Sequence, residues 1–212
     1  LKNVFAKSWA STASFTINDA MLWLADFNKS TSGGFLTNID ELSEFIRLDI
    51  STLTPTLAAQ GNEFLETLSG IYSGEVLLSV EHGDFDFCNV FRKKDNSIFV
   101  VDFEHAEEGC LPFFDIGNIL FSSLVREWKD HGRGERLEVF CANQGWDDVV
   151  NKSVKSYANR SGMALDILEH LPGFVAIRQF TKTFPDSRDP KDYPLYDSDV
   201  FSQMLLWKLD LS

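Results

Sequence analysis

A short hairpin pattern in the middle of a largely helical sequence is the feature that most constrains how this 212-residue chain can fold. Two β-prone runs, at 90–92 and 97–101, flank a polar stretch of the kind that forms a tight turn. Just before them, residues 75–80 form a short, mostly apolar run that ends at His82-Gly83, which predicts a buried strand. We therefore expect an α+β fold in which the β structure lies at the centre of the chain.

Apolar residues recur at helical spacing on both sides of this centre, so the fold is expected to be mostly α-helical. Helices are predicted at 17–28, from a cap at Asn38 to about 48, from Pro55 to near Gly70, from Asp115 onward, near 134–143, 147–159 and 163–170, after Pro172, and near 198–209. Residues 184–195 hold three of the six prolines and are predicted to form a loop. We expect a single domain over 1–212, with a helical part (1–74), a loop and hairpin (75–102) and a second helical part (103–212).

Composition limits the classes of function. The chain has 19 Lys and Arg against 32 Asp and Glu, a net charge of −13, which argues against binding to nucleic acid or to anionic membranes. No apolar run is long enough to span a bilayer, so we expect no membrane insertion and a cytoplasmic protein. Cys88, Cys110 and Cys141 match no zinc-binding spacing and are expected to be reduced thiols, with Cys88 buried and inert.

The residues best suited to chemistry surround the predicted hairpin. The stretch that begins at His82 reads H-G-D-x-x-x-x-N and contains Asp84 and Asn89, and Asp102 follows 13 residues later. In phosphoryl transfer, one carboxylate accepts the proton of the acceptor hydroxyl, while an amide oxygen and a second carboxylate hold Mg²⁺. Antiparallel pairing across the turn would bring Asn89 and Asp102 close together.

This segment resembles the catalytic loop and metal-binding segment of the aminoglycoside phosphotransferase and choline kinase superfamily, which has the protein-kinase-like fold. That family reads H-x-D-x-x-x-x-N and then I/V-D-F/W-E, which here is Val101-Asp102-Phe103-Glu104. The resemblance implies that Asp84 is the catalytic base and that His82 supports the catalytic loop. It also implies that Asn89 and Asp102 bind Mg²⁺ and, through it, ATP.

The resemblance continues for about 40 residues, over 81–120, into Gly109, Pro112 and a helix that opens with Asp115. Asp115 is expected to cap that helix, although the family uses this position to brace the catalytic loop. Glu104 is a further candidate for the site, with a solvated role as its plainer interpretation. Two departures are Cys88, where many members have Gly, and about one extra residue between Asp102 and Asp115.

The kinase family also has a strand-rich N-terminal lobe that binds the nucleotide. The residues ahead of His82 read instead as helices, and Gly132-x-Gly134 lacks the third glycine and the preceding strand of a phosphate-covering loop. The resemblance therefore implies a C-terminal lobe alone, with the N-terminal lobe missing from this chain.

Two functions are compatible with these residues. The first is an ATP- and Mg²⁺-dependent phosphotransferase that acts on a hydroxyl of an aminoglycoside, choline, ethanolamine or a sugar-like acceptor. The acidic charge permits a cationic acceptor, for which Trp128, Trp146 and Trp207 could form a cage, although core packing is their plainer interpretation. The alternative is a non-catalytic, kinase-like binding or interaction module.

Overall fold

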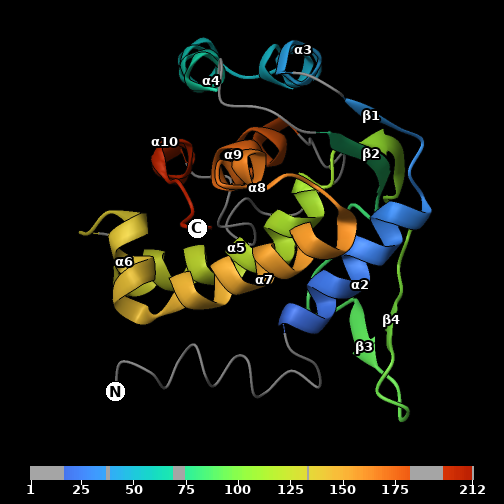
Figure 1. Ribbon diagram of the computed structural model, residues 1–212. Coiled ribbons are helices and arrows are strands. Elements are labelled where there is room, and N and C mark those ends of the chain that lie inside the picture. Colours follow the sequence, from blue (N-terminus) through green and yellow to red (C-terminus); the bar gives the residue numbers. More distant parts are fainter. Residues whose placement is uncertain (1–16, 37–38, 69–74, 133, 182–197, 212) are drawn as a thin grey trace.

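The computed structural model describes residues 17–36, 39–68, 75–132, 134–181 and 198–211. Within these ranges the chain has an α+β fold, built mostly from helices around small antiparallel sheets, as the sequence predicts (Figure 1). None of the described helices is both long enough and apolar enough to cross a membrane.

The helices follow the predicted order. They are α2 (Ile17–Ser30), α3 (Ile39–Ile50), α4 (Pro55–Thr67), α5 (Phe113–His131), α6 (Leu137–Gln144), α7 (Trp146–Ser161), α8 (Leu165–Leu168), α9 (Leu171–Thr181) and α10 (Ser198–Leu206). Pro55 is the first residue of α4, where its missing N–H leaves no helical hydrogen bond unmade. The predicted cap at Asn38, the helix end near Gly70 and the loop at 184–195 lie outside the described residues.

The β structure forms two separate sheets. The predicted hairpin is confirmed as β3 (Val90–Arg92) paired with β4 (Ile98–Val100), and the predicted buried strand as β2 (Val76–Glu81). The prediction was incomplete, because β2 also pairs on one side with β1 (Gly34–Leu36) and on the other with β5 (Glu107–Cys110). Each of the two parts predicted to be helical thus contains one short strand.

Pairing with β2 explains why β5 escaped prediction. The sequence of β5 is Glu-Glu-Gly-Cys, which has little intrinsic preference for a strand. Its register with β2 shifts between the pairs Ser79↔Cys110 and Glu81↔Glu107. Gly109 lies in this irregularity with a φ of +72°, a conformation that glycine adopts without a steric penalty. Tertiary contact, and not local preference, therefore makes this segment a strand.

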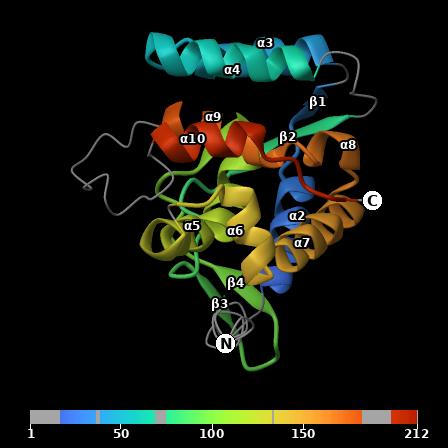
Figure 2. The ribbon, with the colours of Figure 1, turned by 90° about the vertical axis from the view of Figure 1, so that its left-hand side faces the viewer.

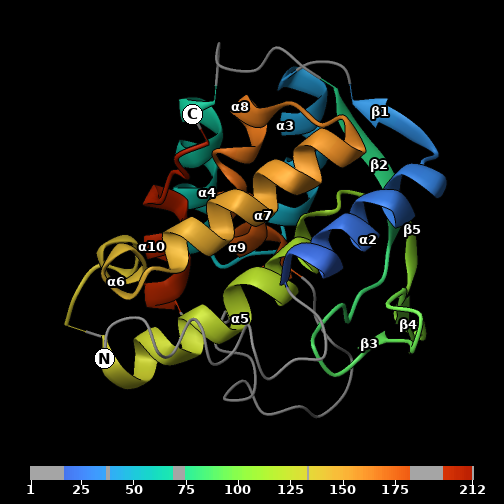
Figure 3. The ribbon, with the colours of Figure 1, turned by 60° about the horizontal axis from the view of Figure 1, so that its bottom comes forward.

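The two sheets lie at different places in the molecule. Helices α3 and α4 form one end of the molecule, and the β3–β4 hairpin forms the opposite end (Figures 1 and 2). Helix α2 lies along α7, and α9 packs against both α5 and α10 (Figure 3). This packing buries apolar side chains of all these helices in one core.

A buried polar network joins α2, α7 and β2 inside this core. The Tyr157 hydroxyl donates to Asn28 Oδ1 at 2.9 Å, and Asn28 Nδ2 donates to Ser79 Oγ at 3.0 Å and to the Val80 carbonyl at 3.3 Å. Asn28 is fully buried, so its amide needs these partners. The network fixes the last residues of β2, which lead directly into the candidate site.

Candidate active site

One buried carboxylate, that of Asp115, binds the backbone of the segment that follows β2. Asp115 Oδ2 accepts the backbone N–H of His82 at 2.6 Å, and Oδ1 accepts that of Gly83 at 3.0 Å. The prediction that Asp115 caps its helix was wrong, because the N-cap residue of α5 is Pro112 and Asp115 is the third residue of the helix. Its carboxylate braces the loop instead, which agrees with what the family resemblance implied.

Gly83 permits this close packing of the loop. Its φ is +85°, and a Cβ at this position would lie 2.4 Å from the carbonyl oxygen of His105. Both observations exclude a larger residue here without local rearrangement.

His82 connects the loop to the end of the hairpin. Its Nδ1 accepts the backbone N–H of Asp84 at 3.2 Å, so its Nε2 carries the proton and donates to the Val101 carbonyl at 2.9 Å. The ring packs against Phe103, with centroids 4.4 Å apart. Burial lowers the pKa of His82, while the Val101 bond and the nearby carboxylates of Asp84 and Asp102 oppose that shift.

We expect the His82 ring to remain neutral at pH 6.5 and to gain a proton only at lower pH. A proton on Nδ1 would face the N–H of Asp84, so protonation breaks the contact that shapes the loop. Because the pKa of His82 is lower in the folded state, its contribution to stability is complete above the unfolded value of about 6.5 and is lost as the pH falls. A ¹⁵N NMR titration of the ring measures this, and a midpoint at or above 6.5 contradicts it.

Asp84 and Asn89, the two residues that the motif places five apart, contact each other directly. Asn89 Nδ2 donates to the backbone carbonyl of Asp84 at 2.9 Å and to its Oδ2 at 3.0 Å. The turn between them is closed by Asp86, whose Oδ1 accepts the N–H of Cys88 at 2.7 Å and that of Asn89 at 3.3 Å. The Asp84 side chain is therefore oriented by Asn89, at a position where the residue is 9% exposed.

Asp102 lies at the open end of the hairpin, beside this pair. The Val101 N–H donates to the Asn89 carbonyl at 3.1 Å, which extends the β3–β4 ladder by one step beyond Val90↔Val100. Asp102 follows at once, is exposed and has a φ of +67°. Its charge acts on the His82 ring together with that of Asp84. The prediction that pairing across the hairpin brings Asn89 close to Asp102 agrees with this geometry.

The oxygens of Asn89 and Asp102 fit a hard cation. Both hydrogen bonds of the Asn89 side chain use Nδ2, which leaves Oδ1 out of them. Over the described residues there is no group of three or more His, Cys, Asp or Glu side chains that could hold a metal ion by themselves. Mg²⁺ needs no such group when substrate phosphates and water complete its oxygen ligands. Asn89 and Asp102 thus offer oxygen donors of the kind that Mg²⁺ prefers.

Other candidates of the sequence have plainer roles. Glu104 lies on an exposed turn, where its carboxylate is 3.3 Å from the His105 ring nitrogen. The prediction that Cys88 is buried was wrong, because its side chain is exposed. The carboxylate of Asp86, then burial and then Asp84 raise the pKa of Cys88, which disfavours the reactive thiolate.

The three tryptophans considered as a cation cage are core residues. Trp128 and Trp146 are buried, and their Nε1 atoms donate to the Glu135 carbonyl at 2.9 Å and to Glu127 Oε2 at 3.0 Å. Trp207 is also buried and contacts Phe121 edge-on. Their arrangement is that of packing.

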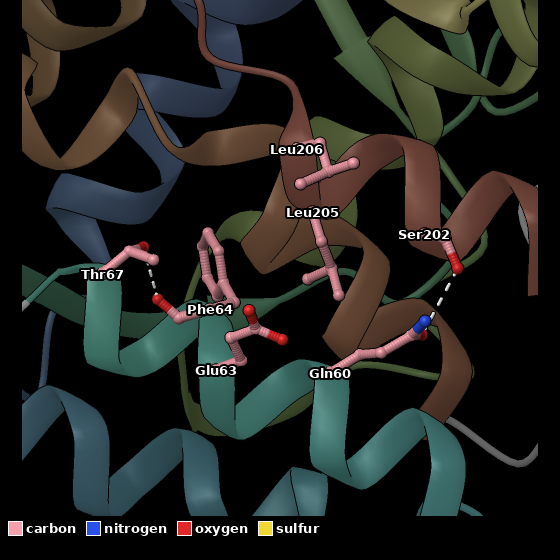
Figure 4. Close-up of a pocket in the computed structure, with 7 residues that line it drawn as sticks. All are labelled: Gln60, Glu63, Phe64, Thr67, Ser202, Leu205 and Leu206. Atoms are coloured by element: carbon pink, nitrogen blue, oxygen red, sulfur yellow. Dashed lines mark hydrogen bonds between the residues drawn. The ribbon is translucent and has the colours of Figure 1, made fainter.

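A small hollow lies elsewhere, between α4 and α10 (Figure 4). Its volume is about 180 Å³, and its lining is formed by Gln60, Glu63, Phe64, Thr67, Ser202, Leu205 and Leu206. None of the residues that the motif singled out takes part in it. The residues of the motif lie instead in the loop after β2 and at the end of the β3–β4 hairpin.

The loop and the hairpin bring together residues that the sequence motif predicted to form a site. The Asp84 carboxylate is oriented by the Asn89 amide, and a second carboxylate, Asp102, lies at the end of the hairpin. The buried Asp115 accepts the two backbone N–H groups directly before Asp84. Such a set can accept a proton from a hydroxyl and can hold a cation bound to phosphates. No family model, curated protein or solved structure matches the chain.

Proposed function

We propose that this chain is the C-terminal, protein-kinase-like lobe of an ATP- and Mg²⁺-dependent phosphotransferase of the aminoglycoside phosphotransferase and choline kinase type. The observation that carries the proposal is the pair of hydrogen bonds from Asn89 Nδ2 to Asp84. They join two motif positions in an arrangement that orients a carboxylate and leaves an amide oxygen for a metal. A structural turn would need only the backbone contact.

Each residue has a defined part in the proposed reaction. Asp84 accepts the proton of the acceptor hydroxyl as its oxygen bonds to the γ-phosphorus of ATP and ADP departs. Asn89 and Asp102 would hold Mg²⁺, which would neutralise charge on the phosphate oxygens. His82 fixes the hairpin end relative to Asp84, and its hydrogen bond to Val101 keeps Asp102 in position.

The acceptor belongs to the class of small hydroxyl compounds: aminoglycosides, choline, ethanolamine or sugar-like molecules. The net charge of −13 permits the cationic members of this class. The helices after Asp115 are the proposed acceptor side.

Replacing Asp102 with asparagine tests the nucleotide site. Asparagine tolerates the positive φ of Asp102, so the variant removes the charge while the backbone can stay the same. We expect Mg²⁺·ATP to bind at least about tenfold more weakly, because one of two protein oxygen ligands loses its charge. Isothermal titration calorimetry measures this on the 212-residue chain and on the longest N-terminally extended form of the protein.

The matched control is Asp95→Asn. Asp95 is an exposed aspartate on the same hairpin and contacts Ser97 locally, so its variant should bind Mg²⁺·ATP like the unaltered protein. If the extended form does not bind Mg²⁺·ATP, the phosphotransferase proposal is wrong, and the non-catalytic binding or interaction module becomes the hypothesis to test.

A further inference from the structure

One guanidinium gathers three acidic side chains directly behind the candidate catalytic loop. Arg178 of α9 contacts Glu81 at 3.2 Å through Nε, Asp49 at 3.3 Å through Nη1 and Glu107 at 3.3 Å through Nη2. Nη2 also lies 3.5 Å from Cys110 Sγ. These partners come from the end of α3, from β2 and from β5, so a single side chain links three elements to α9.

Glu81 is the member of this cluster closest to the loop. It is the last residue of β2, it directly precedes His82, and its side chain is completely buried. A buried carboxylate is strongly unfavourable without a cationic partner. Arg178, whose side chain is 17% exposed, provides that partner.

The backbone pairing increases the need for Arg178. Glu81 and Glu107 are directly opposite each other in the antiparallel pair of β2 and β5, at the position beyond the register shift. Like charges in directly opposite positions destabilise a sheet. Arg178 contacts both carboxylates and so closes the last pair of the sheet at the point where the loop departs.

The two chain segments that follow Glu81 and Glu107 contact each other through Asp115. The segment after Glu81 supplies the N–H groups of His82 and Gly83, and the segment after Glu107 leads through β5 to Asp115, which accepts them. The planar fork of a guanidinium fixes the directions of its partners, whereas an apolar contact or a lysine does not. Burial, as the largest cause, raises the pKa of Asp49, while Arg178 lowers it and Glu81 raises it further.

We propose that Arg178 is a positioning residue that sets the geometry of the His82–Asn89 loop by clamping Glu81 and Glu107. The proposal rests on the phosphotransferase function for its consequence in nucleotide binding. The geometric part, from Arg178 to the His82 ring, stands independently of that function.

The test uses Arg178→Gln, Arg178→Lys and the double variant Arg178→Met with Glu81→Met. Hydrogen exchange of the His82 Nε2 proton, followed by NMR, reports the bond to Val101, and calorimetry reports Mg²⁺·ATP affinity. We expect Arg178→Gln to accelerate exchange and to weaken affinity, each about tenfold, the scale of a lost orienting contact. Arg178→Lys keeps the positive charge but loses the planar guanidinium. Compared with Arg178→Gln, it should therefore restore thermal stability more than it restores slow exchange of the His82 proton or Mg²⁺·ATP affinity.

The double variant distinguishes a positioning role of Arg178 from a role that only neutralises Glu81. It also keeps the proposal testable if Arg178→Gln does not fold. It removes the buried charge of Glu81 together with its partner, so the variant should fold and unfold cooperatively on heating. The His82 Nε2 proton should nevertheless exchange faster than in the unaltered protein. Arg160→Gln is the matched control, because Arg160 forms an exposed ion pair with Asp26 at 2.6 Å that shares no residue with the Arg178 cluster. Wild-type exchange in the double variant would overturn the proposal. If the unaltered protein binds no Mg²⁺·ATP, the proposed function fails, but the exchange measurement still decides the role of Arg178.

Discussion

Replacing Asp115 with alanine should lower the free energy of unfolding by about 3–6 kcal/mol, since two hydrogen bonds to a charged group are lost and each contributes roughly 1.5–3 kcal/mol. The carboxylate is fully buried and accepts two backbone N–H groups, from His82 and from Gly83. Alanine leaves both donors buried without an acceptor, and each then retains its full desolvation penalty. Urea unfolding followed by circular dichroism gives the free-energy difference directly.

The chain offers a close control for this substitution. Asp148 is also the third residue of a helix, α7, but its side chain is exposed. Asp148→Ala therefore removes only the favourable interaction with the helix dipole, which is about 0.3–1 kcal/mol. Asp115→Asn should lie between the two alanine variants, because an amide oxygen can still accept a hydrogen bond. If Asp115→Ala is no more destabilising than Asp148→Ala, then the carboxylate does not brace the loop.

The loss of stability should be accompanied by loosening of the loop itself. Without Asp115, the N–H groups at 82–83 lose the contacts that hold the turn in place below Asp84. Amide exchange should therefore increase more at these residues than in α7, whose hydrogen bonds do not involve Asp115.

The range of each interaction along the chain determines what the sequence could predict. Apolar periodicity is local, so the helices and the β3–β4 hairpin were predicted at nearly the observed positions. The contact of Asn89 with Asp84 spans only five residues, and the motif was therefore sufficient to indicate it. β1 and β5 are strands because of their pairing with β2, which no local pattern encodes.

The long-range contacts of the site could not be predicted from the sequence for the same reason. Arg178 is 97 residues from Glu81 and 129 from Asp49, and Tyr157 is 129 from Asn28. Asn28 alone among these residues had a local signal, because it is a polar side chain on the otherwise apolar buried face of its helix. For Asp115, the local sequence indicated a helix cap, which was wrong, whereas the family resemblance implied the bracing role that the geometry shows.

Asp84→Asn should reduce phosphoryl transfer by about 10²–10⁴-fold, the range over which a positioned general base acts. The amide oxygen of the new side chain can still accept from Asn89 Nδ2, so the loop should keep its shape. Mg²⁺·ATP affinity should consequently remain within a few-fold of the unaltered protein, in contrast to Asp102→Asn. The measurement is transfer of ³²P from ATP to a panel of aminoglycosides, choline, ethanolamine and sugars, with the longest form of the protein.

Asp86→Asn serves as the control, since Asp86 lies in the same loop and its Oδ1 accepts two backbone N–H groups that an asparagine oxygen can also accept. We expect this variant to transfer phosphate at close to the normal rate. A common fall in both variants would mean that the charge of the loop matters and not the position of one carboxylate. Normal transfer by Asp84→Asn would remove Asp84 as the base. Because the asparagine in Asp84→Asn can still accept from Asn89 Nδ2, a loss confined to Asp84→Asn ties turnover to the carboxylate charge at position 84 and not to the shape of the loop.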